Sequence, residues 1–162
     1  MRSTVAVIPL RERPGLCAFF TRHFESEWPN WYGPNGRASA RSDLEDYANA
    51  AGDLPVGVVA LDESMSPVGV AALRATSIES HSHLSPWATA GFVIPSRRRQ
   101  GIGADLLAGL LVEASRLGHQ FIFCATASAV SLLMREGWTQ IDKVLHDGEV
   151  QFVFQWAVPS AA

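Results

Sequence analysis

The stretch from residue 87 to residue 125 restricts the possible fold more than any other part of the chain. It contains a strand candidate, Trp87 to Ile94, then an amphipathic helix, Gly101 to Leu117, and then a short apolar strand, Phe121 to Ala125. A strand, a helix and a second strand in this order predict a parallel pair, because parallel strands need a crossover connection. We therefore expect a mixed sheet with helices on its faces.

The helix in this unit is the clearest in the sequence. Gly118 follows its last apolar residue, as a glycine often does at a helix C-terminus. A single apolar face at period 3.6 is typical of a helix that packs on a sheet. The residues on this face are Ile102, Leu106, Leu107, Leu110, Leu111, Ala114 and Leu117.

The other segments predict the order strand, two helices, three strands, helix, strand, helix and two strands. Ser42 and Glu45 form a capping box that is expected to open a helix to about Ala51. The Asp147–Gly148 pair predicts a hairpin turn. The fold class is thus α+β, an α/β sandwich. Its central sheet is mixed, mostly antiparallel and of about six to seven strands, and about four helices pack on it. The predicted strands cover 4–8, 54–61, 67–78, 87–94, 121–125, 138–145 and 150–158, the helices cover 10–24, 42–51, 101–117 and 128–135, and 27–39 is a loop.

Length and charge exclude several classes of protein. A chain of 162 residues fits one domain, over 1–162. Its formal net charge of −3 argues against a nucleic-acid binder, and no apolar run approaches the ~20 residues of a membrane span. Cys17 and Cys124 lack metal-ligand spacing and are expected to be buried thiols rather than a disulfide or a metal site. A reducing, cytoplasmic setting is expected.

The turn before the long helix carries the most informative motif. In the segment FVIPSRRRQGIGADLL, residues 92 to 107, a strand ends at Pro95 and three arginines precede Gly101 and Gly103. Unpaired N–H groups at a helix N-terminus bind anions, phosphate above all, and arginines add charged donors. The dinucleotide fingerprint fails because Leu106 replaces its third glycine, and no Walker A lysine is present. The alternative is a loop whose arginines are merely solvated.

The spacing of Arg98, Gly101 and Gly103 resembles the acyl-CoA motif, Q/R-x-x-G-x-G/A, of the GCN5-related N-acetyltransferase (GNAT) superfamily. The resemblance extends to ATASAVSLLMREGW at 125–138, which is similar to the end of the family's fifth strand and its fourth helix. LPVGVVAL at 54–61 and PVG at 67–69 resemble its second and third strands. The similarity covers about residues 54 to 158, and the first fifty residues match only in layout.

The resemblance implies a fold and a ligand. The ligand would be acetyl-CoA, its diphosphate bound by main-chain N–H groups at the helix start and its pantetheine arm paired with the fourth strand, which splays away from the fifth. A backbone N–H there would polarise the thioester carbonyl. The residues implied in this binding are Phe92, Val93, Ile94, Arg98, Arg99, Gln100, Gly101, Ile102, Gly103, Ala104, Thr126 and Ser128.

Acyl transfer to an amine needs a neutral nitrogen, so a base is useful. The candidates are His83, Glu79 and His81, just before the fourth strand, with His83 the first choice. The alternative is an exposed loop with solvated side chains, and no metal site is expected from these histidines. In many relatives of this family a Tyr at the position of Leu133 protonates the departing thiolate. Without it, three outcomes are open: the thiolate leaves unprotonated, water or Ser131 supplies the proton, or activity is slow or absent.

The amine acceptor is expected to lie against an aromatic wall formed by Trp31 and Tyr32, because rings attract cations. Trp28 is expected to pack at an edge. The alternating face of Phe152, Phe154 and Trp156 is expected to be core, with a homodimer interface as the alternative. The expected activity is an N-acetyltransferase acting on a primary amine of a small molecule or a peptide. The rivals are an acyl-CoA-binding module without catalysis and a nucleotide-phosphate binder unrelated to CoA.

Overall fold

The computed structural model describes residues 4–159, and its seven strands form a single sheet in the order β1-β2-β3-β4-β5-β7-β6. Of the single domain expected over 1–162, residues 1–3 and 160–162 lie outside the described part. All neighbouring strands are antiparallel except β4 and β5, so the expected mixed, mostly antiparallel sheet is confirmed. The strands are β1 (Ala6–Pro9), β2 (Val56–Leu61), β3 (Pro67–Arg74), β4 (Trp87–Val93), β5 (Phe121–Thr126), β6 (Thr139–His146) and β7 (Glu149–Ala157).

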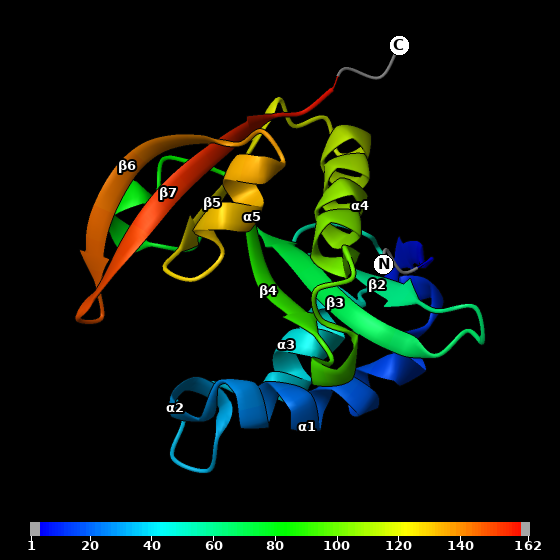
Figure 1. Cartoon of the computed structure of the whole chain (residues 1–162). Helices are drawn as coiled ribbons and strands as arrows, with labels where there is room; N and C mark the ends of the chain where they lie inside the picture. The colour runs from blue at the N-terminus through cyan, green and yellow to red at the C-terminus, as the bar shows by residue number, and fades with distance from the viewer. Residues whose placement is uncertain (1–3, 160–162) are drawn as a thin grey trace.

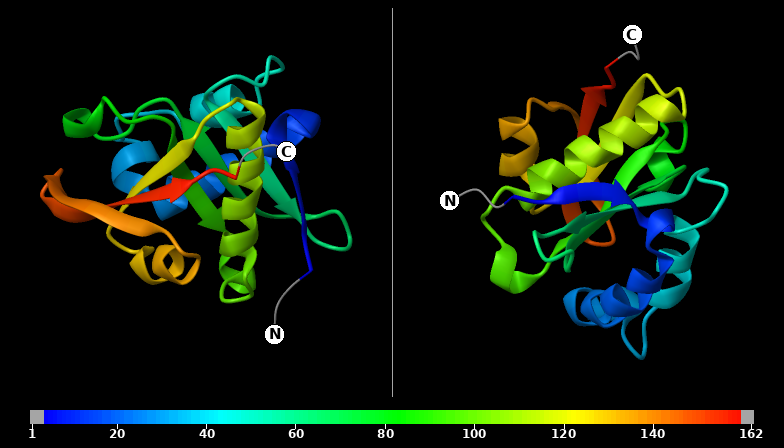
Figure 2. Two further views of the ribbon diagram at one scale, coloured as in Figure 1. Left: turned by 90° about the horizontal axis from the view of Figure 1, so that it is seen from above. Right: turned by 90° about the vertical axis from the view of Figure 1, so that its right-hand side faces the viewer.

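Helices cover both faces of the β1–β4 half of the sheet (Figure 1). Helix α4 packs on one face and buries Ile102, Leu106 and Leu110 against β2 and β3. The first helices pack on the other face through Phe20, Phe24 and Leu44, so three layers are visible from the side (Figure 2). The helices are α1 (Cys17–Glu27), α2 (Pro29–Tyr32), α3 (Ala40–Tyr47), α4 (Ile102–Arg116) and α5 (Val130–Arg135), with short 3₁₀ turns η1 (Leu10–Glu12), η2 (Pro14–Leu16), η3 (Glu79–His81) and η4 (Pro95–Arg97).

Several predicted boundaries were wrong, each for a local reason. Helix α3 begins one turn earlier than the capping box suggests, because Ser39 is its N-cap and accepts a hydrogen bond from the Ser42 N–H group at 3.1 Å. Glu45 instead accepts from Arg41 Nε at 2.9 Å. The helix predicted over 10–24 opens as two 3₁₀ turns and becomes α-helical only at Cys17, and the predicted loop contains α2. Strand β3 ends at Arg74, before the predicted limit at 78.

The hairpins were predicted correctly. Asp147 and Gly148 adopt positive φ of 50° and 78° between β6 and β7, as a tight hairpin turn requires. On β7, Phe154 is fully buried and contributes to the core. Phe152 and Trp156 are partly buried against the same core, so this face serves mainly for packing inside the chain.

Candidate active site

The sheet opens into a fork between its two parallel strands. Within residues 4–159, β4 and β5 share one register pair, Trp87 with Phe123, and the Phe123 N–H group donates to the Pro86 carbonyl at 3.0 Å. The aromatic rings of this pair lie 5.7 Å apart and hold the base of the fork closed. Beyond it the strands separate (Figure 1), so the edge of β4 over residues 88–93 has no strand partner on its β5 side.

A bulge in β4 lies at the fork. The pairing with β3 passes from Thr89 opposite Ala72 to Phe92 opposite Val70, which leaves an extra residue on β4. Ala90 lies within this bulge and adopts a positive φ of 55°. Bulges bend a strand and redirect its main-chain groups, and they recur beside active sites. This bulge therefore orients the main chain of β4 at the fork.

The N-terminus of α4 lies at the open end of the fork, and its first main-chain N–H groups are free to donate hydrogen bonds. Gly101 adopts φ 84°, a left-handed conformation that suits glycine. No residue of the described chain accepts a hydrogen bond from the N–H groups of 101–104. A set of unpaired amides at the positive end of a fifteen-residue helix is an anion site. The main-chain geometry is thus compatible with the phosphate site predicted from the sequence motif, whose role stays a prediction.

Two cavities run along the fork and join. One has a volume of about 570 Å³ and lies between β4, β5 and β7, and the other, about 500 Å³, lies at the start of α4. Since seven residues line both, they form one continuous groove from the helix N-terminus to the β6–β7 hairpin. These shared residues are Trp28, Gly91, Phe92, Val93, Gly103, Ser128 and Leu132.

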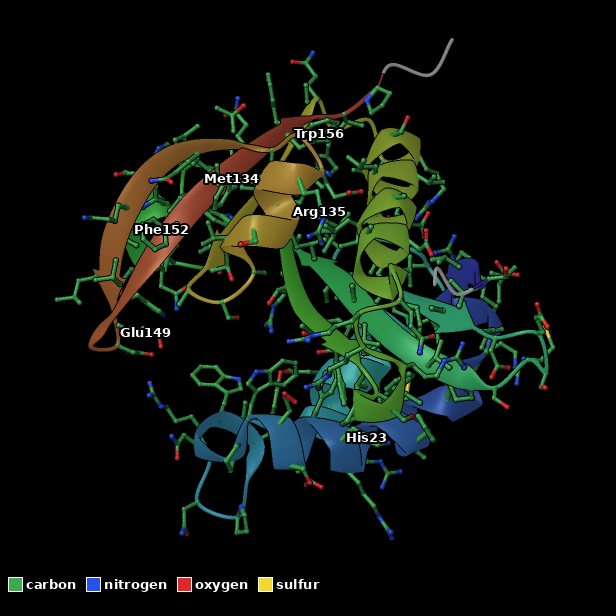
Figure 3. The ribbon with its side chains drawn as sticks, in the orientation of Figure 1. His23, Met134, Arg135, Glu149, Phe152 and Trp156 are labelled. Atoms are coloured by element: carbon green, nitrogen blue, oxygen red, sulfur yellow. The ribbon has the colours of Figure 1, made fainter. Side chains whose placement is uncertain are left out.

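The two ends of the groove differ in charge. Arg97, Arg98, Arg99 and Arg135 line the cavity at the start of α4, together with the carboxylates of Glu27 and Glu136. Figure 3 shows Arg135 on α5, so the four arginines come from two separate segments of the chain. The cluster makes this end of the groove positive and suited to phosphate groups.

The side chain of Arg98 is held by the protein. Its Nε donates to the Val93 carbonyl at 2.8 Å, and one terminal nitrogen lies 2.9 and 3.2 Å from the two carboxylate oxygens of Glu27. Its guanidinium carbon lies 5.4 Å from the centre of the Phe92 ring. Arg98 thus links the end of α1 to the end of β4 beside the amides of 101–104.

Most of the predicted CoA contacts lie along the groove, although their roles stay predictions. Thr126 lines the larger cavity, where its hydroxyl accepts from the Ser128 and Ala129 N–H groups at 3.2 and 2.9 Å. Ile94 and Gln100 line neither cavity, and Gln100 accepts from Arg97 Nε at 3.0 Å. The predicted residues in the smaller cavity are Phe92, Val93, Arg98, Arg99, Gly101, Ile102, Gly103, Ala104 and Ser128.

The three predicted bases lie together but away from the groove. Glu79, His81 and His83 line neither cavity. The ring of His81 lies between Ser80 Oγ and Asp142 Oδ2, at 2.8 Å from each, and the ring of His83 stacks on it at 5.9 Å. The hydrogen bond from His81 lowers the pKa of Asp142. This cluster ties the loop before β4 to β6.

The predicted acceptor aromatics also lie elsewhere. Trp31 is 40% exposed with the Arg37 guanidinium 5.1 Å from its ring centre, and Tyr32 is buried with its hydroxyl 2.7 Å from Asp43 Oδ2. Burial and this hydrogen bond raise the pKa of Tyr32. Trp28, expected only to pack at an edge, packs on Phe24 and also lines both cavities. The sequence gives no local signal for this place, because the groove is formed by residues distant in the chain.

Sequence reasoning missed two polar residues on β7. Glu149 and Gln151 line the larger cavity, and their alternate spacing on a strand places them on one face. Leu133 lines this cavity too and is 1% exposed in the core, as expected. Cys124, predicted to be buried, is only partly buried, and desolvation raises the pKa of its thiol to about 12. Such a thiol is a poor nucleophile near neutral pH.

No group of three or more His, Cys, Asp or Glu side chains in residues 4–159 could hold a metal ion. No helix in this range is long and apolar enough to cross a membrane. Both described cysteines are free thiols.

Comparison with known proteins shows the fold. No protein-family profile and no curated protein sequence matches the chain. Among solved structures, an aminoglycoside 6'-N-acetyltransferase complexed with coenzyme A matches with a TM-score of 0.76 at 14% identity over 97% of this chain and 99% of that one. A GNAT superfamily phosphinothricin acetyltransferase from Sinorhizobium meliloti, in complex with acetyl-CoA, matches with a TM-score of 0.72 at 17% identity over 96% and 89%.

A third match is plant NAA60 from Arabidopsis thaliana in complex with acetyl-CoA, with a TM-score of 0.71 at 13% identity over 96% of this chain and 99% of that one. These lengths agree, so the likeness covers the whole arrangement of sheet and helices rather than the motif alone. The chain has the GNAT acyltransferase fold, and the resemblance seen in its sequence is confirmed at the level of the fold.

Proposed function

We propose that this chain is an acyl-CoA-dependent N-acyltransferase that transfers acetyl from acetyl-CoA to a primary amine of a small molecule or a peptide. One observation carries the proposal: the groove starts at four unpaired amides of α4 and continues along an unpaired edge of β4. Amides suit a diphosphate, and a bare strand edge suits an extended arm with amide groups. The solved structures of the same fold, described with CoA or acetyl-CoA, support the choice of ligand.

A glycine beside the groove supports this choice of ligand. A Cβ atom added at Gly103 would lie 3.2 Å from the Leu132 side chain across the groove, so glycine keeps this passage open. Residues 101–104 would hold the diphosphate, and the β4 edge over 88–93 would hold the pantetheine arm. In this proposal a main-chain N–H group near the bulge of β4 would polarise the thioester carbonyl.

The reaction follows as direct attack in a ternary complex. The neutral amine forms a C–N bond to the acyl carbon, the C–S bond breaks, and the electron pair leaves on sulfur. The amine proton passes to a base through water, and His83, Glu79 and His81 stay the proposed bases, which need such a relay because none lines the groove. The pKa of about 12 at Cys124 argues against an acyl-enzyme on that thiol.

A second candidate function is an acyl-CoA-binding module without catalysis. The observation that favours it is Leu133, which is buried in the core and offers no proton to a leaving thiolate. Both functions share the groove, and they differ in whether turnover occurs.

The experiment is thiol release from acetyl-CoA with a panel of primary amines, together with thermal shifts by CoA and by ATP. We expect amine-dependent thiol release and a larger shift with CoA, since a ligand stabilises in proportion to its occupancy. Binding of CoA without turnover on any amine would establish the second candidate. Equal, small shifts with both ligands would contradict CoA binding and favour a nucleotide-phosphate site.

A Gly103→Ala variant tests whether the ligand passes through the groove. A methyl group there narrows the passage beside Leu132, so we expect weaker CoA binding by about tenfold, although alanine is the better helix former by roughly 1 kcal/mol. The melting temperature should hold or rise while CoA affinity falls. Gly15→Ala, at a position with open space around it, is the control and should bind CoA normally.

A further inference from the structure

The larger cavity has one charged side chain on its wall. Of the described residues that line it, only Glu149 is charged, and no Lys, Arg or His is among them. The uncharged polar side chains on the wall are those of Ser77, Thr89, Thr126, Ser128 and Gln151. All four arginines of the groove lie in the other cavity, so the groove is positive where phosphates are proposed to bind and negative at its far end.

Glu149 is fixed in place by the hairpin that carries it. It is the first residue of β7 and pairs in register with His146, directly after the tight turn at Asp147 and Gly148. The Gln151 side-chain amide donates to Glu149 Oε1 at 3.2 Å from the same face of the strand. Figure 3 shows Glu149 at the end of the hairpin that faces α1 and α2. Trp28 lines the same cavity from the end of α1.

From this charge pattern we infer the acceptor class: a small amine that carries a second positive charge away from the reacting nitrogen. The inference rests on the proposed function. Glu149 binds the second cation, and the Trp28 ring offers it a π face. A carboxylate at the same place in an acceptor would meet Glu149 with no cation on the wall to pair with it. Glu149 is therefore a specificity-determining residue for diamine-like acceptors over amino acids.

The test compares three acceptors of equal chain length: cadaverine, with two amines, pentylamine, with one, and δ-aminovalerate, with an amine and a carboxylate. We expect kcat/KM to fall in that order, by about two- to fivefold at each step, since Glu149 is solvent-exposed and its pairing is partly screened. Glu149→Gln, which keeps the hydrogen bond to Gln151, should raise the KM for cadaverine to that for pentylamine and leave pentylamine unchanged. Glu149→Lys should favour δ-aminovalerate. Glu63→Gln, in the β2–β3 turn, is the control.

Calorimetric binding of cadaverine to the CoA-saturated protein separates this inference from the proposed function. Glu149-dependent binding without turnover on any amine would overturn the proposed function and keep the cation site. Turnover at equal rates with all three acceptors would overturn the cation site and keep the proposed function. An equal fall in kcat for every acceptor in Glu149→Gln would instead make Glu149 a general base and also overturn the inference.

Discussion

The guanidinium group of Arg98 has three contacts within the protein: the Val93 carbonyl, the Glu27 carboxylate and the Phe92 ring. Its side chain is 44% exposed and that of Glu27 is 32% exposed, so this ion pair adds little to stability. We expect the pair to matter for ligand binding instead. Glu27 puts a negative charge beside the proposed diphosphate site and also forms an ion pair with Arg98. The pair therefore sets how much positive charge a ligand meets.

Opposite effects are expected from the two partners of this pair. Glu27→Gln removes the repulsion and releases Arg98, so CoA should bind about three to ten times more tightly at low salt, whereas Arg98→Ala should weaken binding by at least tenfold. Calorimetric titration with CoA at two salt concentrations measures both. Glu25→Gln, two residues along the same exposed helix, is the control and should change little. Weaker binding in Glu27→Gln would show that the pair acts only to hold α1 in place.

Among the elements, α4 is anchored at both ends by different means. Its first turn presents amides to the groove, and near its C-terminus the Glu113 carboxylate lies 2.6 Å from Arg11 on η1 and 2.8 Å from Arg116. Burial opposes ionisation of Glu113, and the hydrogen bonds from Arg116 and Arg11 outweigh it, so its pKa lies below the ordinary value of 4.5. The ion pairs fix the helix against the N-terminal segment and so orient its first turn.

This anchor predicts a pH-dependent loss of stability. Because the pKa of Glu113 is lowered in the folded state, its contribution is complete above the unfolded value of 4.5 and disappears as the pH falls through the lower folded value. Glu113→Ala should lower the free energy of unfolding by about 2 kcal/mol at pH 7, and the difference from wild type should shrink below about pH 4. Urea unfolding at pH 7 and pH 3 measures both. Glu12→Ala, at an exposed site beside Arg11, should have no such effect.

Elements with strong periodicity were predictable and those set by tertiary contacts were not. Helix α4 and the β6–β7 hairpin follow from local pattern and turn chemistry, so both were placed within a residue or two. The cap of α3 was wrong because Ser39 and Ser42 are both good caps and packing decides between them. The arginine–glycine motif predicted the end of the groove where we propose that the diphosphate binds. The far end is built by residues distant in the chain, so Trp28 and Glu149 carried no local signal for it.

On the scale of the whole molecule, the fork divides the sheet into two parts that meet at Trp87 and Phe123. The four strands β1–β4 pair continuously on one side and β5, β7 and β6 on the other. Trp87 is fully buried, its indole N–H group donates to the Leu84 carbonyl at 2.7 Å, and Val153 packs against it. A ligand in the groove would touch both parts, which makes CoA binding a property of their relative position.

Hydrogen exchange should detect this bridging. We expect the amides of 101–104, and those amides of 88–93 that face the fork rather than β3, to exchange quickly in the free protein and to be protected by CoA. These amides have no partner across the fork or at the helix start, whereas the other β4 amides pair with β3. Amides of the β5 wall, over 124–128, should gain protection in parallel. ATP is the control ligand. Protection of 101–104 alone, equal with ATP and CoA, would show that only a phosphate is recognised.

The open flank of β4 has a further consequence for handling this protein. An unsatisfied row of main-chain groups is a template for any extended polypeptide, and natural proteins usually guard such rows with charge, proline or a covering element. Here the protecting element would be a small molecule, so the proposed coenzyme would also protect the strand edge against self-association. Preparations depleted of it should clump on storage, and restoring it should keep them dispersed.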